Sequence, residues 1–195
     1  MAPPTTLSIV SAAARPDDLD LRPISRAEFD RLLADGWFEG ERIELLEGML
    51  VEMSPEGPEH AWVVQELNRL LTTALPGHLR VRVANPWVAG DLSEPEPDLA
   101  VVPKGVYRRA HPATAVVLIE VSGSSRRKDL GPKATIYARA GAERYWVIDL
   151  VARLVHDHTS PAADGYARIT QHPFEQALEV AGVEVCLARI VDDRP

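Results

Sequence analysis

Two acidic residues, Asp98 and Glu120, stand beside stretches of sequence that we expect to form β-strands. Asp98 follows the proline-rich stretch 94–97, and prolines fix an extended approach to the strand expected at 99–102. Glu120 lies near the end of the apolar run 115–121, where an uncompensated buried carboxylate is costly. Carboxylates at neighbouring strand ends can hold Mg²⁺ or Mn²⁺ while leaving positions open for water and phosphate oxygens. The pair therefore predicts a divalent-metal site.

Each acid taken alone also has an ordinary structural interpretation. Glu120 could simply reach water before the turn at Ser122 and Gly123, and Pro-Asp is a common turn dipeptide. A third carboxylate, Glu44, stands in an early strand or hairpin and could supply another oxygen to the same metal.

A lysine follows Glu120 in the sequence at a spacing that could bring it back to the strand ends. Asp129, Lys133 and Tyr137 are four residues apart and lie along one face of a predicted helix, so Lys133 can point back towards the strand ends. An ammonium group beside a metal would stabilise the charge that develops on phosphorus during phosphodiester hydrolysis. The alternative is a surface ion pair between Asp129 and Lys133, worth about 0.3–0.5 kcal/mol.

Three histidines are weaker candidates. His156 and His158 would share one face of a strand, as a metal-binding pair would, although an exposed hairpin is the simpler interpretation. His60 opens a helix and could lie near Glu44, or it could be a surface or capping residue.

Composition limits the class of protein. The chain has 195 residues, 46% of them hydrophobic, which suffices for one well-cored domain. Its net charge of -8 argues against bulk electrostatic binding to nucleic acid. Cations bound to clustered acids would offset this charge locally, and the basic run 126–128 is either a contact patch or an ordinary solvated loop.

The sequence also indicates the cellular compartment. Its apolar runs are shorter than the roughly 20 residues that span a bilayer, and acidic residues at 17–20 occupy the place of a signal peptide's apolar stretch. The single Cys186 excludes an intramolecular disulfide, and we expect it to be buried in a late strand. These features predict a cytoplasmic protein without membrane association.

The order of predicted elements indicates an α/β fold. Residues 1–22 lack periodicity and are expected to form a disordered arm, and 23–195 form a single domain. The first helix begins at a capping box on Ser25 and ends at Gly36. Further helices are expected at 59–75 and 129–140, a hairpin at 42–53, strands at 79–83, 99–102, 115–121 and 144–149, and shorter strands near 154–155, 166–170 and 183–187. The run 115–121 is apolar on both faces and is expected to be central, and Trp146 is expected in the core.

An ordered series of motifs resembles the Uma-two restriction endonuclease family. The series is Ile43-Glu44-Leu45-Leu46-Glu47-Gly48, Met53-Ser54-Pro55 with His60, Pro97-Asp98-Leu99-Ala100-Val101-Val102, Glu120-Val121-Ser122 with Asp129, Lys133 and Tyr137, and Gly141 with Tyr145-Trp146-Val147-Ile148-Asp149. The match covers roughly residues 25 to 155, and the ordered series is more specific than any one motif.

The resemblance implies a restriction-endonuclease-like PD-(D/E)XK core, a central mixed β-sheet flanked by helices. It also implies Asp98 and Glu120 as metal ligands, Glu44 as a helper acid that joins them, and Lys133 as the catalytic lysine. The superfamily's usual lysine stands two residues after the second acid, where this sequence has Ser122. The lysine is therefore expected on the following helix, which leaves Lys128 as a competitor to Lys133.

These observations lead to one main functional hypothesis and two alternatives. The main hypothesis is a Mg²⁺- or Mn²⁺-dependent endonuclease that hydrolyses phosphodiester bonds in DNA and acts as a homodimer. The first alternative is a catalytically inactive nuclease-like module that binds nucleic acid or another partner. The second is a metal-dependent hydrolase of small phosphoesters, which would turn over mononucleotide-like substrates without binding DNA.

Overall fold

The computed structural model describes residues 21–192, so all but the last two residues of the predicted arm 1–22 lie outside the described part. The helices are α1 (Arg26–Ala34), α2 (Pro58–Ala74), α3 (Arg126–Lys128), η1 (Asp129–Lys133), α4 (Ala134–Arg139) and α5 (Leu187–Val191). The strands are β1 (Ile43–Leu46), β2 (Met49–Glu52), β3 (Leu79–Val83), β4 (Leu99–Pro103), β5 (Val117–Ser122), β6 (Arg144–Asp149), β7 (Leu154–Ala162), β8 (Gly165–Pro173), β9 (Leu178–Val180) and β10 (Val183–Val185). None of these helices is long and apolar enough to cross a bilayer.

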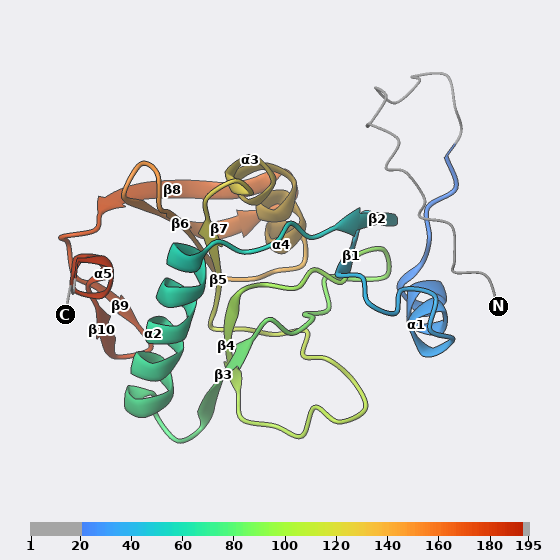
Figure 1. Ribbon diagram of the computed structural model, residues 1–195, viewed down its shortest axis with the longest axis horizontal. Helices are drawn as coiled ribbons and strands as arrows, with labels where there is room; N and C mark the ends of the chain where they lie inside the picture. Colours follow the sequence, from blue (N-terminus) through green and yellow to red (C-terminus); the bar gives the residue numbers. More distant parts are fainter. Residues whose placement is uncertain (1–20, 193–195) are drawn as a thin grey trace.

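A six-stranded sheet, ordered β3-β4-β5-β6-β7-β8, forms the centre of the fold (Figure 1). Its strands pair antiparallel except β5 and β6, which run parallel. A parallel pair needs a crossover connection, and here the chain from α3 to α4 provides it. The predicted mixed sheet flanked by helices is confirmed.

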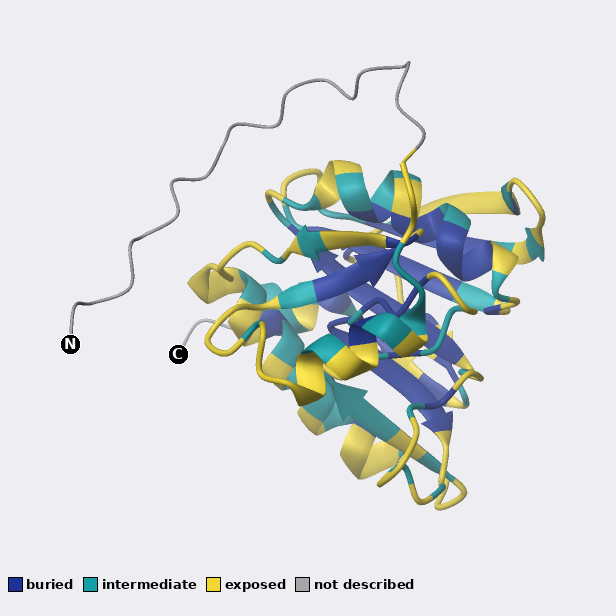
Figure 2. Cartoon of the chain, turned by 90° about the vertical axis from the view of Figure 1, so that its right-hand side faces the viewer, coloured by how far each residue is buried: buried dark blue, intermediate teal, exposed yellow. Residues whose placement is uncertain are grey.

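The central strands of the sheet are buried (dark blue in Figure 2). Alternation along β5 sends its side chains into two separate cores on opposite faces of the sheet. Val117, Ile119 and Val121 pack with α2 on one face, and Leu118 packs with α4 on the other. Glu120 has the same parity as Leu118, so its carboxylate points to the α4 face, where it contacts Tyr137.

The first helix and the hairpin form as predicted. Ser25 caps α1 in a capping box with Glu28, whose side chain accepts a hydrogen bond from the Ser25 backbone. β1 and β2 are joined by Glu47 and Gly48, which both have positive φ angles of 49° and 75°. A two-residue turn with this geometry matches the twist of the flanking strands, and glycine adopts it without steric cost.

The helix expected at 129–140 begins earlier and is irregular. Helical structure starts at Arg126, and a π-helical turn occupies Asp129–Lys133 before α4 begins. Pro132 explains the irregularity, because it has no backbone N–H to donate and its ring clashes with the carbonyl four residues earlier. A wider turn relieves that clash, and such turns occur often at functional sites.

Three details of the expected elements are wrong. The strand expected at 115–121 begins later than predicted, because β5 starts at Val117 and Val116 is 37% exposed. β7 and β8 are nine-residue strands rather than short ones, because they pair with each other from end to end as a hairpin at the edge of the sheet. Cys186 follows β10 and is partly exposed, so it is not buried within a strand.

Candidate active site

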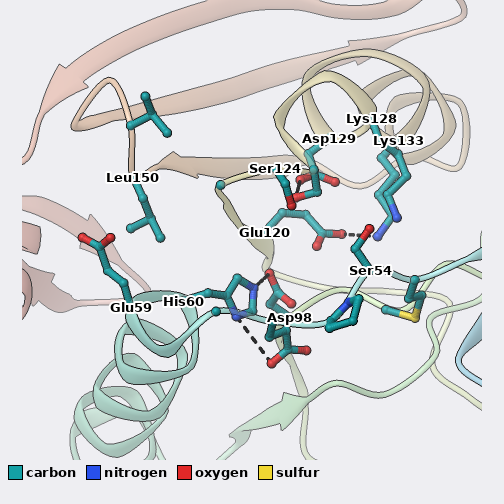
Figure 3. Close-up of a pocket in the computed structure, with 17 residues that line it drawn as sticks. Ser54, Glu59, His60, Asp98, Glu120, Ser124, Lys128, Asp129, Lys133 and Leu150 are labelled. Carbon is teal, nitrogen blue, oxygen red and sulfur yellow. Dashed lines mark hydrogen bonds and ion pairs between the residues drawn. The ribbon is translucent and has the colours of Figure 1, made fainter.

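A pocket of about 340 Å³ opens where β5 ends and α2 begins (Figure 3). Its charged side chains are Glu56, Glu59, His60, Asp98, Glu120, Lys128, Asp129 and Lys133. The two acids predicted as principal metal ligands therefore meet in one pocket. Glu44 does not line the pocket, but it contacts Lys128 and Lys133, which do.

Glu120 is anchored by two hydrogen bonds to the same carboxylate oxygen. Lys133 Nζ donates to Glu120 Oε1 over 2.8 Å, and the Tyr137 hydroxyl donates to it over 2.9 Å. The side chain is 5% exposed. Burial raises the pKa of Glu120 well above its usual value, and the positive charge of Lys133 opposes that rise.

Lys133 bridges two buried acids. Its ammonium group lies 2.9 Å from Glu44 Oε2 and 2.8 Å from Glu120 Oε1, and its side chain is 2% exposed. Burial lowers the pKa of Lys133, but the two carboxylates outweigh burial and raise it, so the side chain stays charged. The alternative of a routine surface ion pair with Asp129 is therefore wrong.

Both oxygens of Glu44 are engaged by lysines. Lys128 Nζ donates to Glu44 Oε1 over 2.7 Å, while Lys133 is paired with Oε2. Burial raises the pKa of Glu44, but the two ammonium groups outweigh it and lower the pKa below its usual value. In this arrangement Glu44 positions the two lysines, and its expected contribution of a metal-binding oxygen stays a prediction.

Asp98 is oriented by groups from two other elements. The backbone N–H of Val121 donates to Asp98 Oδ2 over 2.7 Å, and His60 Nε2 lies 3.0 Å from the same oxygen. Pro97 precedes Asp98 and the strand β4 follows it, so the backbone that carries the Asp98 side chain is held in place. His60 was expected near Glu44, but the first turn of α2 places it against Asp98 instead.

Asp129 is buried at the pocket wall, with 1% of its surface exposed. Its Oδ2 atom accepts hydrogen bonds from the hydroxyls of Ser122 and Ser125, at 2.6 and 2.5 Å. Burial raises the pKa of Asp129, although Lys133 and the two serines oppose the rise. Ser122, which stands where the superfamily's lysine is usual, thus holds a carboxylate at the site.

His156 and His158 do not reach this pocket. Both are buried on β7 rather than exposed on a hairpin, with 4% and 1% of their surfaces accessible. His158 packs its ring against Tyr145, and His156 lies 3.7 Å from Asp149. Neither belongs to a group of three or more possible metal ligands within residues 21–192.

The donor set fits a divalent cation. The described hydrogen bonds of Glu120 all end on Oε1 and those of Asp98 on Oδ2, so each carboxylate keeps a second oxygen for another partner. Buried carboxylates without full compensation are costly, and a hard cation satisfies them. In the described part of the chain, Glu56, His60 and Asp98 form a group of three in which each residue could offer one ligand atom to the same ion.

The comparison with known families agrees with this site. The Uma2 family model, described as "Putative restriction endonuclease", matches residues 26–188. The chain belongs to the Uma2 family. The match extends beyond the series of motifs that indicated the family, and it includes every charged residue of the pocket. No curated protein matches this Uma2 sequence.

A solved structure shares the Uma2 fold. It is a protein from Anabaena variabilis ATCC 29413, described as a "putative nuclease belonging to DUF820", and it superposes with a TM-score of 0.70. The two sequences are 13% identical, and the alignment covers 87% of this chain and 98% of the other. At this identity the likeness concerns the fold, and it agrees with the restriction-endonuclease-like architecture.

Sequence reasoning did not place Glu56 in the Uma2 pocket. Glu56 lies 3.4 Å from His60 Nδ1, and the spacing of four residues between them was the available signal. Asp129 was expected on the helix face of Lys133 and stands in the series of motifs, but nothing in the sequence shows that Ser122 and Ser125 would converge on its carboxylate.

Proposed function

We propose that this Uma2 protein is a metal-dependent endonuclease that hydrolyses phosphodiester bonds in DNA. The observation that carries the proposal is the buried contact of Lys133 with Glu120 in a pocket that also contains Asp98. Two carboxylates and a fixed ammonium group at strand ends suit the hydrolysis of a phosphate ester. A Mg²⁺ or Mn²⁺ ion held by Asp98 and Glu120 would activate the phosphate and the attacking water.

The chain's own residues determine how the phosphate is oriented and how its charge is stabilised. Lys133 remains charged between Glu44 and Glu120, so it cannot accept a proton and acts as a fixed positive charge. Charge that develops on the phosphate oxygens is stabilised most by groups that need no reorganisation. We therefore assign Lys133 as the catalytic lysine, positioned by Glu44.

Lys128 has a different role in this proposal. Its side chain is 25% exposed and lines both the main pocket and the adjoining groove that contains Arg127. A lysine with one partner and access to solvent can contact a neighbouring phosphate of the DNA backbone. Arg126, the neighbour of Arg127 in the chain, is half-exposed and paired with the buried Asp149.

Incubation of the purified protein with DNA tests the proposal. Supercoiled plasmid and single-stranded DNA would each be incubated with Mg²⁺, with Mn²⁺ or with a chelator, and a mononucleotide ester would serve as the small-substrate control. We expect nicking or linearisation that requires the metal. Hydrolysis of the small ester alone would instead support the phosphoester hydrolase.

A further inference from the structure

At the mouth of the pocket, Asp98 meets two residues that the nuclease proposal does not use, Glu56 and His60. His60 stands between two carboxylates: Nε2 is 3.0 Å from Asp98 Oδ2, and Nδ1 is 3.4 Å from Glu56 Oε2 (Figure 3). One ligand atom from each of the three residues lies within 4.8 Å of the others. The cluster therefore combines one imidazole nitrogen with carboxylate oxygens.

The separation between His60 Nε2 and Asp98 Oδ2 matches that between two ligands of a bound ion. Two ligands at right angles around an ion about 2.1 Å away are about 3 Å apart, and these two atoms are 3.0 Å apart. One ion takes only one nitrogen of the ring, so the contact of Nδ1 with Glu56 is a separate ion pair. The His60 Nδ1 atom is also buried without a hydrogen-bond partner among the described residues, so it has a lone pair or proton to satisfy.

The three side chains come from two elements of the fold. His60 projects from the first turn of α2, Glu56 precedes the N-cap of that helix, and Asp98 precedes β4. The helix and the strand both belong to the packed core, through Val63 and Leu99. His60 and Asp98 are therefore presented by rigid elements, which metal sites need for a defined geometry.

We propose that Glu56, His60 and Asp98 form a divalent transition-metal site that shares Asp98 with the Asp98–Glu120 site. This inference rests on the proposed function, because the shared carboxylate joins the two sites. Imidazole nitrogen suits Co²⁺ or Zn²⁺, whereas Mg²⁺ prefers oxygen ligands. The expectation of an oxygen-only ligand set thus changes, since the structure brings a histidine to Asp98. This site then prefers transition-metal ions over Mg²⁺ more strongly than a site made of oxygen ligands alone does.

Metal titration of the full-length protein tests this site without using activity. Co²⁺ is the probe, because its visible absorption reports nitrogen ligation, and Mg²⁺ is the reference in parallel calorimetry. We expect His60→Gln to weaken Co²⁺ binding at least about tenfold, since residues that merely support a metal ligand already contribute that much. Mg²⁺ binding should change by less than about threefold.

Matched controls separate ligation from general electrostatics. Glu56→Gln should weaken Co²⁺ binding, whereas Glu59→Gln removes the same charge from the same pocket and should not. His78→Gln is the control for an exposed histidine. Circular dichroism of each variant establishes that its fold is retained before its titration is compared.

Each remaining outcome has a definite meaning. Equal weakening of Co²⁺ and Mg²⁺ by His60→Gln would show that His60 only orients Asp98, and unchanged Co²⁺ binding would also overturn the site. If Asp98→Asn and Glu120→Gln abolish Mg²⁺ binding while His60→Gln changes neither ion, only this inference fails. If the unmodified protein binds neither ion, both this inference and the proposed nuclease function fail.

Discussion

The ammonium group of Lys133 lies 2.8 Å from Glu120 Oε1, and both side chains are buried. A buried charge pair contributes little net stability when intact, but removal of one partner leaves the other uncompensated. Lys133 is also paired with Glu44, which it shares with Lys128, so its one ammonium group contacts two buried carboxylates. Its substitution therefore affects both stability and catalysis.

Lys133→Ala should lower the free energy of unfolding by about 3–5 kcal/mol, because it leaves Glu44 and Glu120 facing each other without a shared cation. Urea unfolding at neutral pH would measure the loss. Lys128→Ala is the matched control, and its more exposed side chain should give a much smaller change. Equal losses from the two variants would contradict the assignment of Lys133 as the buried counter-ion.

The same two variants should differ in catalysis. Loss of a fixed charge that acts on the transition state should slow single-turnover cleavage about 10²–10³-fold in Lys133→Ala. In Lys128→Ala, DNA binding should weaken and the slope of its salt dependence should fall by about one unit, with little change in the chemical step. Small and equal rate effects would show that the catalytic lysine is assigned wrongly.

Tyr137→Phe should destabilise the fold by about 1–3 kcal/mol, because the hydroxyl that donates to Glu120 is buried and its loss leaves the carboxylate with Lys133 as its described donor. Thermal unfolding checks this value. Metal binding through Asp98 should survive the change. Tyr166→Phe removes a hydroxyl that donates to the carbonyl of Ala142, remote from the site, and should leave cleavage unaffected.

Stability should decrease as pH rises from about 4.5 to 7 because of Glu94. Burial raises the pKa of Glu94 to about 7, the nearby charge of Asp30 adds to the rise, and Arg26 opposes it. The folded protein therefore holds this proton in a pH range where the unfolded chain releases it, and the contribution to stability is lost as pH increases.

Glu94→Gln should remove that pH dependence and raise stability at pH 8. The difference between about 7 and the usual 4.5 corresponds to at most about 3 kcal/mol. Urea unfolding between pH 5 and 8 would compare the variant with Glu39→Gln, an exposed control. A wild-type slope that persists in the variant would assign the effect to other groups.

The homodimer predicted from the cleavage of both DNA strands is tested by light scattering. Small nuclease domains commonly supply two active sites by two-fold association. At micromolar concentration the mass should be twice 21.4 kDa. A mass of 21.4 kDa, with or without DNA, would argue against dimeric cleavage.

Much of the fold follows from local sequence rules. The alternation around Glu120, the capping box of Ser25 and the turn at Gly48 each depend on neighbouring residues, so they could be predicted. The length of β7 could not be predicted in this way. Its residues Thr159 and Pro161 pair with β8, and the local composition does not reveal this pairing.

The site was predictable where residues share an element and not where separate elements meet. The spacing put Lys133 and Tyr137 on one helix face and directed Lys133 towards the strand ends, and in the structure both donate to Glu120. The contact of His60 with Asp98 depends on how α2 packs against the sheet, across 38 residues of sequence. Such long-range contacts are decided by tertiary packing, which local patterns do not encode.

The central claim is that Glu120 and its neighbours form the catalytic centre for phosphodiester hydrolysis. Its most direct test is the single-turnover cleavage rate of supercoiled plasmid by Glu120→Gln, measured in Mn²⁺ with protein in excess and compared with the unmodified protein. Glu120→Gln keeps the size of the side chain and removes its charge. We predict metal-dependent cleavage by the unmodified protein and at least a 10²-fold lower rate in the variant. Equal rates in both proteins, or no cleavage by the unmodified protein with either metal, would contradict the account.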